Sequence, residues 1–300
     1  MSTQQASYVT VDVFTSERLA GNQLAVIKVD KDHDLSPETK QRIAREFNFS
    51  ETVFLHHDDP AQAPRADIYT PVNEMDFAGH PVIGTGHVLF RQLLPGLPDS
   101  AGTTSCPQTL MTKAGPVAIR YKPENQTVSA QIPHNIHIHS KEIPSLTLAK
   151  TQTGLREASL QSGFPVVSIV KGVTYALVDF TKSPDLFAAV SSGPSPTVDL
   201  DDGWEGHTLV QDLAVRMIAI DLEDPACDSG TATLASFLAL QDGRKNGRYS
   251  FNLDQGSEIK RQSYITVEVV LDERGAGVST VALAGQAALA MSGNLYLPKS

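Results

Sequence analysis

A short segment occurs twice in this chain, and the repeat strongly limits the folds that the chain can adopt. The first copy begins at Glu74 and the second at Glu223, 149 positions later. Each copy has an acidic residue, a turn of small residues and an apolar stretch of helical character, and the shift aligns His80 with Ser229. Ordered self-similarity at a fixed distance indicates a duplicated structural unit. We therefore expect two related halves.

The first copy is expected to place polar groups at the start of a buried helix. Pro81 suits the first helical position, beside Gly79 and His80. The N–H groups of a first helical turn have no acceptor within the helix, so they can bind an anion or a polarised carbonyl. Gly84 and Gly86 are poor helix formers in water and are tolerated mainly where backbone packs closely. If each half presents such a helix to a common cleft, a small anionic substrate would bind there.

Composition sets the outer limits on class and location. The chain has 300 residues, 41% of them hydrophobic and 19% charged, which is typical of a globular protein with two domains. A formal net charge of −10 argues against nucleic acid and against an anionic membrane as partners. The sequence has no long apolar span and no signal-peptide pattern, so we expect a cytoplasmic protein. Two cysteines are too few for a disulfide framework or a four-cysteine zinc site.

Hydrophobic periodicity and turn residues predict alternating strands and helices. The segments at 8–14 and 23–29 are predicted to form a hairpin, and a helix with Pro37 at its first position is predicted to run to about Asn48. Further strands are expected at 50–55, 65–70, 117–121, 128–132, 166–170, 174–179, 264–271 and 279–284, with a second central helix at 231–241.

Three histidines, His134, His137 and His139, lie close together in the sequence. We interpret them as part of a surface strand, because no carboxylate or cysteine cluster follows them at the spacing of metal ligands. No metal site is expected from the sequence.

Six motifs follow one another along the sequence: Val11–Ser16, Gly21-Asn22, Ser50-Glu51-Thr52, Phe77–Pro81, Glu223–Ala226 and Gln255-Gly256. In kind and order they resemble the motifs of PhzF-like proteins, which are the phenazine-biosynthesis isomerases and their relatives. The resemblance spans the chain from residue 8 to the last strands. It implies an α+β, diaminopimelate epimerase-like fold with two pseudo-repeated domains, each a curved, barrel-like sheet around a central helix, and an active site between them. The domains would be 1–133, joined by the returning segment 285–300, and 134–284.

The resemblance also implies a function. PhzF-like isomerases move a proton between carbons of a small carboxylate-bearing metabolite without a metal or organic cofactor, and a homodimer is expected. The position of the acid/base matches Glu51, and a glutamate becomes a useful proton carrier at neutral pH when burial raises its pKa. The remaining matches are His80 and Asp224 as catalytic residues, and Asn22, Gly79, Ser229 and Gly230 as substrate-binding residues.

The second copy departs from the family pattern and leaves alternatives open. Relatives commonly have Thr-Gly-Ser where this chain has Cys227-Asp228-Ser229, so a carboxylate replaces a glycine. Cys227 resembles in its place a catalytic cysteine of the epimerase relatives, which leaves open a racemase or epimerase of an amino-acid-like compound. A non-catalytic small-molecule binding protein of the same fold is the other alternative. Ser229 would also suit a purely structural helix N-cap.

Overall fold

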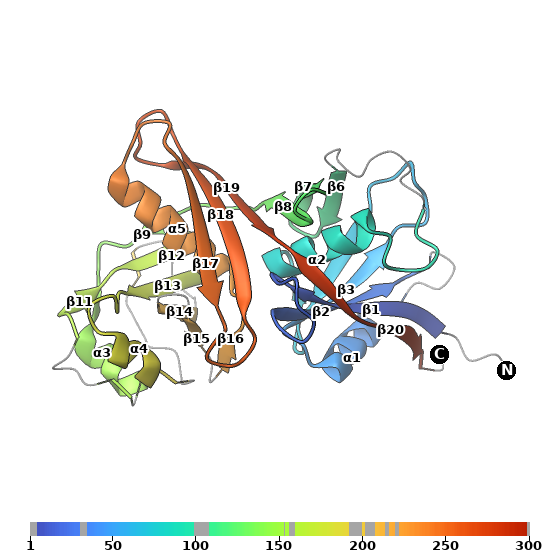
Figure 1. Ribbon diagram of the computed structural model, residues 1–300, viewed down its shortest axis with the longest axis horizontal. Helices are drawn as coiled ribbons and strands as arrows, with labels where there is room; N and C mark the ends of the chain where they lie inside the picture. The colour runs from blue at the N-terminus through green and yellow to red at the C-terminus, as the bar shows by residue number, and fades with distance from the viewer. Residues whose placement is uncertain are drawn as a thin grey trace. The chain divides into compact units, whose positions relative to one another are not determined.

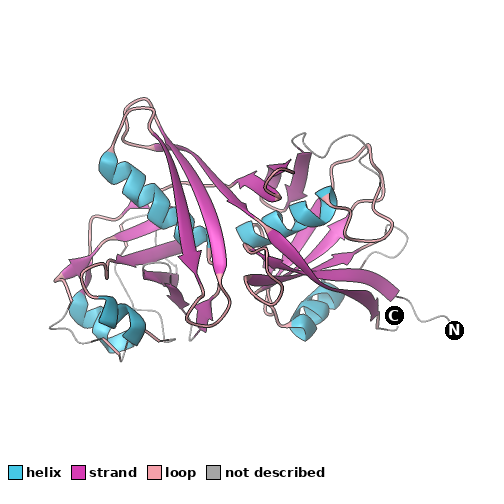
Figure 2. Cartoon of the chain, viewed as in Figure 1, coloured by secondary structure: helices cyan, strands magenta, loops and turns pink. Residues whose placement is uncertain are grey.

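The computed structural model describes residues 5–30, 35–98, 108–152, 154–155, 160–191, 200–201, 208–213, 216–219 and 222–298 (Figure 1). Strands form most of the regular structure, and the helices are few (Figure 2). The expected α+β class is therefore confirmed. Among the described helices, none is both long enough and apolar enough to cross a membrane.

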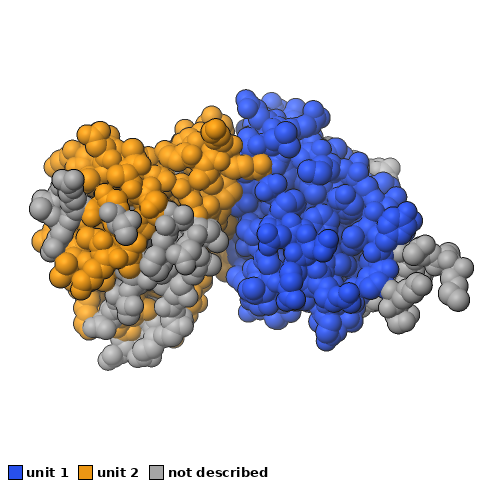
Figure 3. Space-filling model, turned by 90° about the horizontal axis from the view of Figure 1, so that it is seen from below, with its two compact units in different colours: residues 1–131, 283–300 blue, residues 132–282 orange. Residues whose placement is uncertain are grey.

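The chain forms two compact units, which Figure 3 distinguishes by colour. Unit 1 comprises residues 1–131 and 283–300, and unit 2 comprises residues 132–282. Strand β19 (Val278–Gly285) passes from unit 2 into unit 1.

Unit 1 contains a sheet with the strand order β8-β7-β6-β4-β3-β2-β1-β20, and β5 pairs with β4. The predicted hairpin is confirmed, since β1 and β2 pair antiparallel from Tyr8 opposite Ile27 to Val13 opposite Asn22. The strands are β1 (Gln5–Val13), β2 (Asn22–Lys28), β3 (Glu51–His56), β4 (Arg65–Tyr69), β5 (Glu74–Met75), β6 (Gln108–Thr112), β7 (Gly115–Lys122), β8 (Thr127–Gln131) and β20 (Ala287–Tyr296).

Helix α1 (Pro37–Phe47) forms where its local signals predict it. The Ser36 side chain accepts a hydrogen bond from the Thr39 N–H at the start, and Asn48 ends the helix in the left-handed conformation. Ile43 and Ala44 pack into a buried cluster with residues of β2 and β3. The amphipathic pattern therefore covers one face of the unit 1 sheet.

Helix α2 (Gly79–Phe90) is the central helix of unit 1, and all twelve of its residues are buried. It contacts strands β1, β2, β3, β4, β7, β8 and β20. A Cβ atom added at Gly84 would lie 2.5 Å from Leu24 Cδ2 and 2.8 Å from Val13 Cγ2, so glycine permits this close packing. The expectation of a buried helix is confirmed, whereas the expected position of Pro81 is wrong. Pro81 is the third helical residue, where its missing N–H still costs no intrahelical hydrogen bond.

Unit 2 also surrounds a central helix, α5 (Asp228–Asp242), which contacts β12, β13, β14, β17 and β18. Its strands form one sheet in the order β16-β15-β14-β13-β12-β9, the run β17-β18-β19, and a short pair, β10-β11. The elements are β9 (His137–Ile138), β10 (Ile143–Pro144), α3 (Ser145–Thr151), β11 (Gly163–Phe164), β12 (Val166–Val170), β13 (Val173–Val178), α4 (Pro184–Ala189), β14 (Thr208–Leu213), β15 (Arg216–Ala219), β16 (Leu222–Asp224), β17 (Arg248–Gln255) and β18 (Ser263–Leu271).

Helix α5 begins three residues earlier than the sequence predicted. The residue that caps it is Cys227, whose Sγ accepts a hydrogen bond from the Gly230 N–H at 3.4 Å. Ser229 therefore lies inside the helix, as its second residue, and not at the N-cap. Serine is the more common cap, so the sequence pattern alone favours the wrong residue.

Candidate active site

Glu51 and His80 meet at the start of the central helix of unit 1. Glu51 is the first residue of β3 and stands opposite Leu24 in the parallel β2–β3 pair. His80 is the second residue of α2, and its Nδ1 lies 3.3 Å from Oε2 of Glu51. The side chain of His80 is 3% exposed and that of Glu51 is 17% exposed. The structure thus holds a carboxylate and an imidazole together in a largely water-excluded place.

Two more of the predicted residues, Asn22 and Gly79, lie next to the segments that carry this pair. Asn22 is buried at the start of β2, and its Oδ1 accepts a hydrogen bond from the Ser50 hydroxyl at 3.3 Å. Ser50 immediately precedes Glu51, so this contact holds the start of β3 against the start of β2. Gly79 is the first residue of α2 and is buried. Its N–H is one of the first-turn N–H groups, for which the helix itself provides no acceptor.

The other predicted residues form a second set at the start of α5 in unit 2. Cys227 is 5% exposed, and its Sγ lies 3.3 Å from the Tyr175 hydroxyl and 3.7 Å from the Ser229 hydroxyl. The Tyr175 and Ser229 oxygens are 2.6 Å apart. The Gly230 N–H is engaged by the Cys227 cap. A hydroxyl, a phenol and a thiol therefore converge on the first turn of this helix.

Sequence reasoning did not select Tyr175. It lies on β13, 52 residues before Cys227, and is only 1% exposed. The hydroxyl of a buried tyrosine needs a hydrogen-bond partner, and this need is the signal that could have pointed to Tyr175. The neighbouring sequence does not identify the partner.

Asp224 and Gln255 organise the segment that leads into α5. The Asp224 carboxylate accepts a hydrogen bond from the Ala226 N–H at 2.9 Å, which closes a turn around Pro225. The Gln255 side chain donates to the Asp224 carbonyl at 2.7 Å and accepts from the Cys227 N–H at 3.2 Å. Gly256 follows with φ of +79°, and a Cβ there would lie 2.7 Å from the Pro225 carbonyl oxygen. These contacts give the Gln255-Gly256 motif a structural role: Gln255 bonds to the segment before α5, and only glycine fits at position 256 beside Pro225.

Asp228 is the first residue of α5 and is half-buried. A carboxylate in the first turn is favoured by the partial positive charge of a helix N-terminus. The same position would also favour the carboxylate of a ligand. Asp228 therefore stabilises the start of α5 and would compete with the carboxylate of any ligand for the same partial positive charge.

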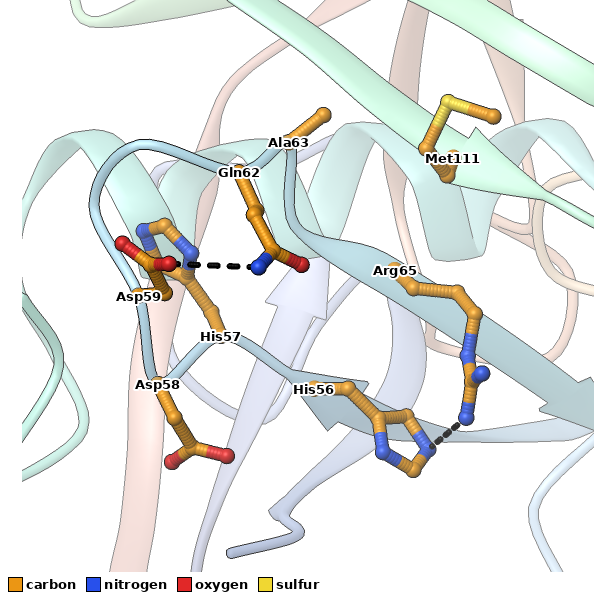
Figure 4. Close-up of a pocket in the computed structure, with 8 residues that line it drawn as sticks. All are labelled: His56, His57, Asp58, Asp59, Gln62, Ala63, Arg65 and Met111. Atoms are coloured by element: carbon orange, nitrogen blue, oxygen red, sulfur yellow. Dashed lines mark hydrogen bonds between the residues drawn. The ribbon is translucent and has the colours of Figure 1, made fainter. Parts of the chain in front are cut away.

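A separate pocket of about 590 Å³ lies in unit 1 at the other end of β3 (Figure 4). Glu51 begins this strand and His56 ends it, so the two are separated by about 17 Å of extended chain. Figure 4 shows His56 and Arg65 turned toward each other, with a nitrogen–nitrogen contact of 3.0 Å. None of the residues predicted for the active site is among the described residues that line this pocket. The lining residues are His56, His57, Asp58, Asp59, Gln62, Ala63, Arg65 and Met111.

Basic side chains near this pocket surround the carboxylate of Asp67. Its Oδ2 lies 2.7 Å from Lys40 Nζ and 2.9 Å from His56 Nε2, and its Oδ1 lies 3.1 Å from Arg65 Nε. Burial by itself raises the pKa of Asp67, but the hydrogen bonds from His56 and Lys40 outweigh it and bring the pKa well below its ordinary value. The Lys40–Asp67 ion pair therefore joins α1 to β4, which is a structural role.

Comparison with known proteins identifies the class. The model of the phenazine biosynthesis-like protein family matches residues 11–293. The trans-2,3-dihydro-3-hydroxyanthranilate isomerase of Pseudomonas aeruginosa is 30% identical, over 97% of this chain and 99% of that protein.

Solved structures agree on the fold. The phenazine biosynthesis protein of the PhzF family from Bacillus anthracis has a TM-score of 0.76 at 19% identity, covering 97% of this chain and 99% of that one. A hydroxyproline epimerase from Agrobacterium vitis has a TM-score of 0.58 at 13% identity, covering 98% and 93%. The fold is thus the diaminopimelate epimerase-like fold that the sequence predicted. The sequence relatives, which are isomerases, show that the protein is an isomerase. The chain belongs to the phenazine biosynthesis-like, or PhzF, family.

Proposed function

We propose that this isomerase transfers a proton between two carbons of a small carboxylate-bearing metabolite, with Glu51 as the proton carrier and no cofactor. The observation that carries the proposal is the 3.3 Å contact between Glu51 Oε2 and His80 Nδ1, made by side chains that are 17% and 3% exposed. A positioned carboxylate of low exposure is suited to general acid–base catalysis, because it transfers a proton without losing it to bulk water.

In the proposed reaction, Glu51 takes a proton from one substrate carbon and returns a proton to another. The carboxylate is restored at the end, so the step needs no oxidant, reductant or second substrate. His80 contacts the same carboxylate oxygen and holds it in one orientation. The N-terminal turn of α2, which begins at Gly79, would stabilise negative charge that develops on the substrate.

The set at the start of α5 is proposed to bind the substrate carboxylate. Ser229 offers a hydroxyl, the backbone of the first turn offers N–H groups, and Asp224 would accept a hydrogen bond from a substrate amine or hydroxyl. Asp228 would weaken this binding, because its carboxylate interacts with the same partial positive charge at the start of α5. Asn22 would contribute by holding the start of β3 against the start of β2, and Gly230 by the hydrogen bond from its N–H to the Cys227 cap.

The first compound to test is trans-2,3-dihydro-3-hydroxyanthranilate, the compound named for the Pseudomonas aeruginosa relative. NMR in deuterated water would follow deuterium uptake by this compound and by a panel of amino and hydroxy acids. Glu51→Gln is expected to lower uptake by about 10²- to 10⁴-fold, the usual contribution of a general acid–base. Glu124→Gln, at an exposed carboxyl, is the matched control and should leave uptake unchanged. Full uptake in Glu51→Gln would refute the assignment.

Asp228→Gly tests the carboxylate-binding role separately. Removal of the competing charge is expected to lower KM for an anionic substrate with little change in kcat, because only binding is altered. An unchanged KM would place substrate binding away from the start of α5.

A thiol-dependent racemase is the second candidate, since Cys227 Sγ accepts from the Gly230 N–H at a helix N-terminus, where thiolates are stabilised. Cys227→Ser retains a capping side chain and removes the thiol. Uptake abolished by Cys227→Ser but retained in Glu51→Gln would support the racemase. Ligand binding without uptake of deuterium by any compound would support a binding protein. The expected homodimer and the cytoplasmic location stay predictions.

A further inference from the structure

Two of the three clustered histidines project to the same side of the chain, His137 at the start of β9 (His137–Ile138) and His139 directly after it. His137 and His139 are two residues apart in an extended segment, so their side chains project to one face. Val167 pairs with Ile138, and the His139 N–H donates to the Val166 carbonyl at 2.9 Å, which holds this segment against β12. The expectation of a surface position is wrong for His139, which is only 5% exposed. The two rings lie edge to face, with centroids 4.7 Å apart.

A carboxylate from a distant part of the chain completes the group. Asp201 Oδ2 lies 2.9 Å from His137 Nε2. The Asp201 N–H donates to Nδ1 of His139 at 3.2 Å. One potential ligand atom from each of these three residues lies within 4.8 Å of the other two. The sequence offers no carboxylate at ligand spacing, but the fold brings Asp201 to His139 from 62 positions away.

The second ring nitrogen of His139 has a buried partner. Because the Asp201 N–H donates to Nδ1, that nitrogen carries a lone pair and Nε2 carries the proton. Nε2 lies 2.8 Å from the Ser168 hydroxyl, which lies 2.6 Å from the Thr174 hydroxyl, and both residues are fully buried. Metal-bound histidines commonly donate their other N–H in this way, which fixes the ring and the tautomer.

We propose that His137, His139 and Asp201 form a binding site for a divalent transition cation of the Zn²⁺ class. Two imidazoles and a carboxylate are a ligand set that zinc favours, with a water in the fourth position. Ligand atoms about 2.1 Å from a tetrahedral zinc lie about 3.4 Å apart, so the widest separation of 4.8 Å must shorten by about 1.4 Å. The change also requires the Asp201 N–H to leave His139 Nδ1, so the backbone at Asp201 must move when the ion binds.

The exchange on binding is balanced. The cation takes the place of the hydrogen between His137 Nε2 and Asp201 Oδ2. It also replaces the Asp201 N–H as the partner of His139 Nδ1. The bound ion would join β9 to the segment at residue 201, which makes it a stabilising site in unit 2 and not part of the proposed proton transfer.

The test uses the full chain after treatment with a chelator. Calorimetry with Zn²⁺ and visible absorption with Co²⁺ are expected to show one ion per chain. His137→Gln and Asp201→Asn should each weaken Zn²⁺ binding by at least about tenfold, since each removes a ligand. His134→Gln is the matched control, because His134 contacts the carbonyls of Ile132 and Val278 instead. It should bind Zn²⁺ as the unaltered chain does.

His139 is buried, so a substitution there could disturb folding. Binding at His139 is therefore measured in the unaltered protein, by ¹⁵N NMR of the imidazole nitrogens. Zn²⁺ is expected to shift Nδ1 of His139 and Nε2 of His137. Ser168→Ala should weaken binding without changing the stoichiometry, through loss of the partner of His139 Nε2. No Zn²⁺ binding, unchanged affinity in His137→Gln and Asp201→Asn, or shifts confined to other histidines would each overturn the proposal, the last by showing an adventitious ion only.

Discussion

His87 is a buried histidine whose titration should control the acid stability of unit 1. It lies in α2 with no exposed surface, and its Nε2 is 3.0 Å from the Gly285 carbonyl oxygen. Burial lowers the pKa of His87 to about 4 from its ordinary value of 6.5, and the hydrogen bond to Gly285 opposes only part of this shift. Folding therefore favours the neutral ring.

The sign of the pH effect follows directly. Because the pKa of His87 is lower in the folded state, its contribution to stability is complete above pH 6.5 and is lost as pH falls toward 4. Between pH 7.5 and 4.5, this linkage removes about 2.5 kcal/mol from the free energy of unfolding. Below pH 4 both states bind the proton, and the loss levels off.

The assay compares the unaltered chain with His87→Gln, which keeps an N–H donor but does not titrate. Denaturant unfolding at pH 7.5 and 4.5 gives the loss of stability for each, and the difference between the two losses isolates His87. The variant should lose about 2.5 kcal/mol less over this interval. NMR titration of the His87 ring gives its pKa directly. Equal losses in both proteins, or a ring pKa near 6.5, would refute the reasoning.

Two further substitutions test the packing of each unit by denaturant unfolding. Gly84→Ala places a Cβ 2.5 Å from Leu24 Cδ2, so overpacking of about 1–3 kcal/mol should exceed the gain in helix propensity of about 1 kcal/mol; a stabilised variant would contradict this. Arg216→Met breaks the buried bidentate pair with Glu223 and should cost about 3–5 kcal/mol. The double variant with Glu223→Leu should recover most of this loss, and no recovery would show that the uncompensated Glu223 charge is not the cause.

Local signals in the sequence predicted the elements that local interactions stabilise. Ser36 and Pro37 define the start of α1 through contacts within four residues, and the structure confirms both. Gly84 predicted close packing of α2, because a helix with glycines in its interior is stable mainly when it is buried. The start of α5 was misplaced because Cys227, an uncommon cap, occupies the position where serine is usual.

The sequence by itself determined the α+β class, the family and the identity of the chemical groups, because motifs and periodicity are carried by neighbouring residues. Only the tertiary structure decided which groups meet. Three contacts join residues from separate segments of the chain: Glu51 with His80, Tyr175 with Ser229, and His137 with Asp201. Such contacts depend on strand register and on the packing of a central helix, and many segments must be placed together before any one pair is defined.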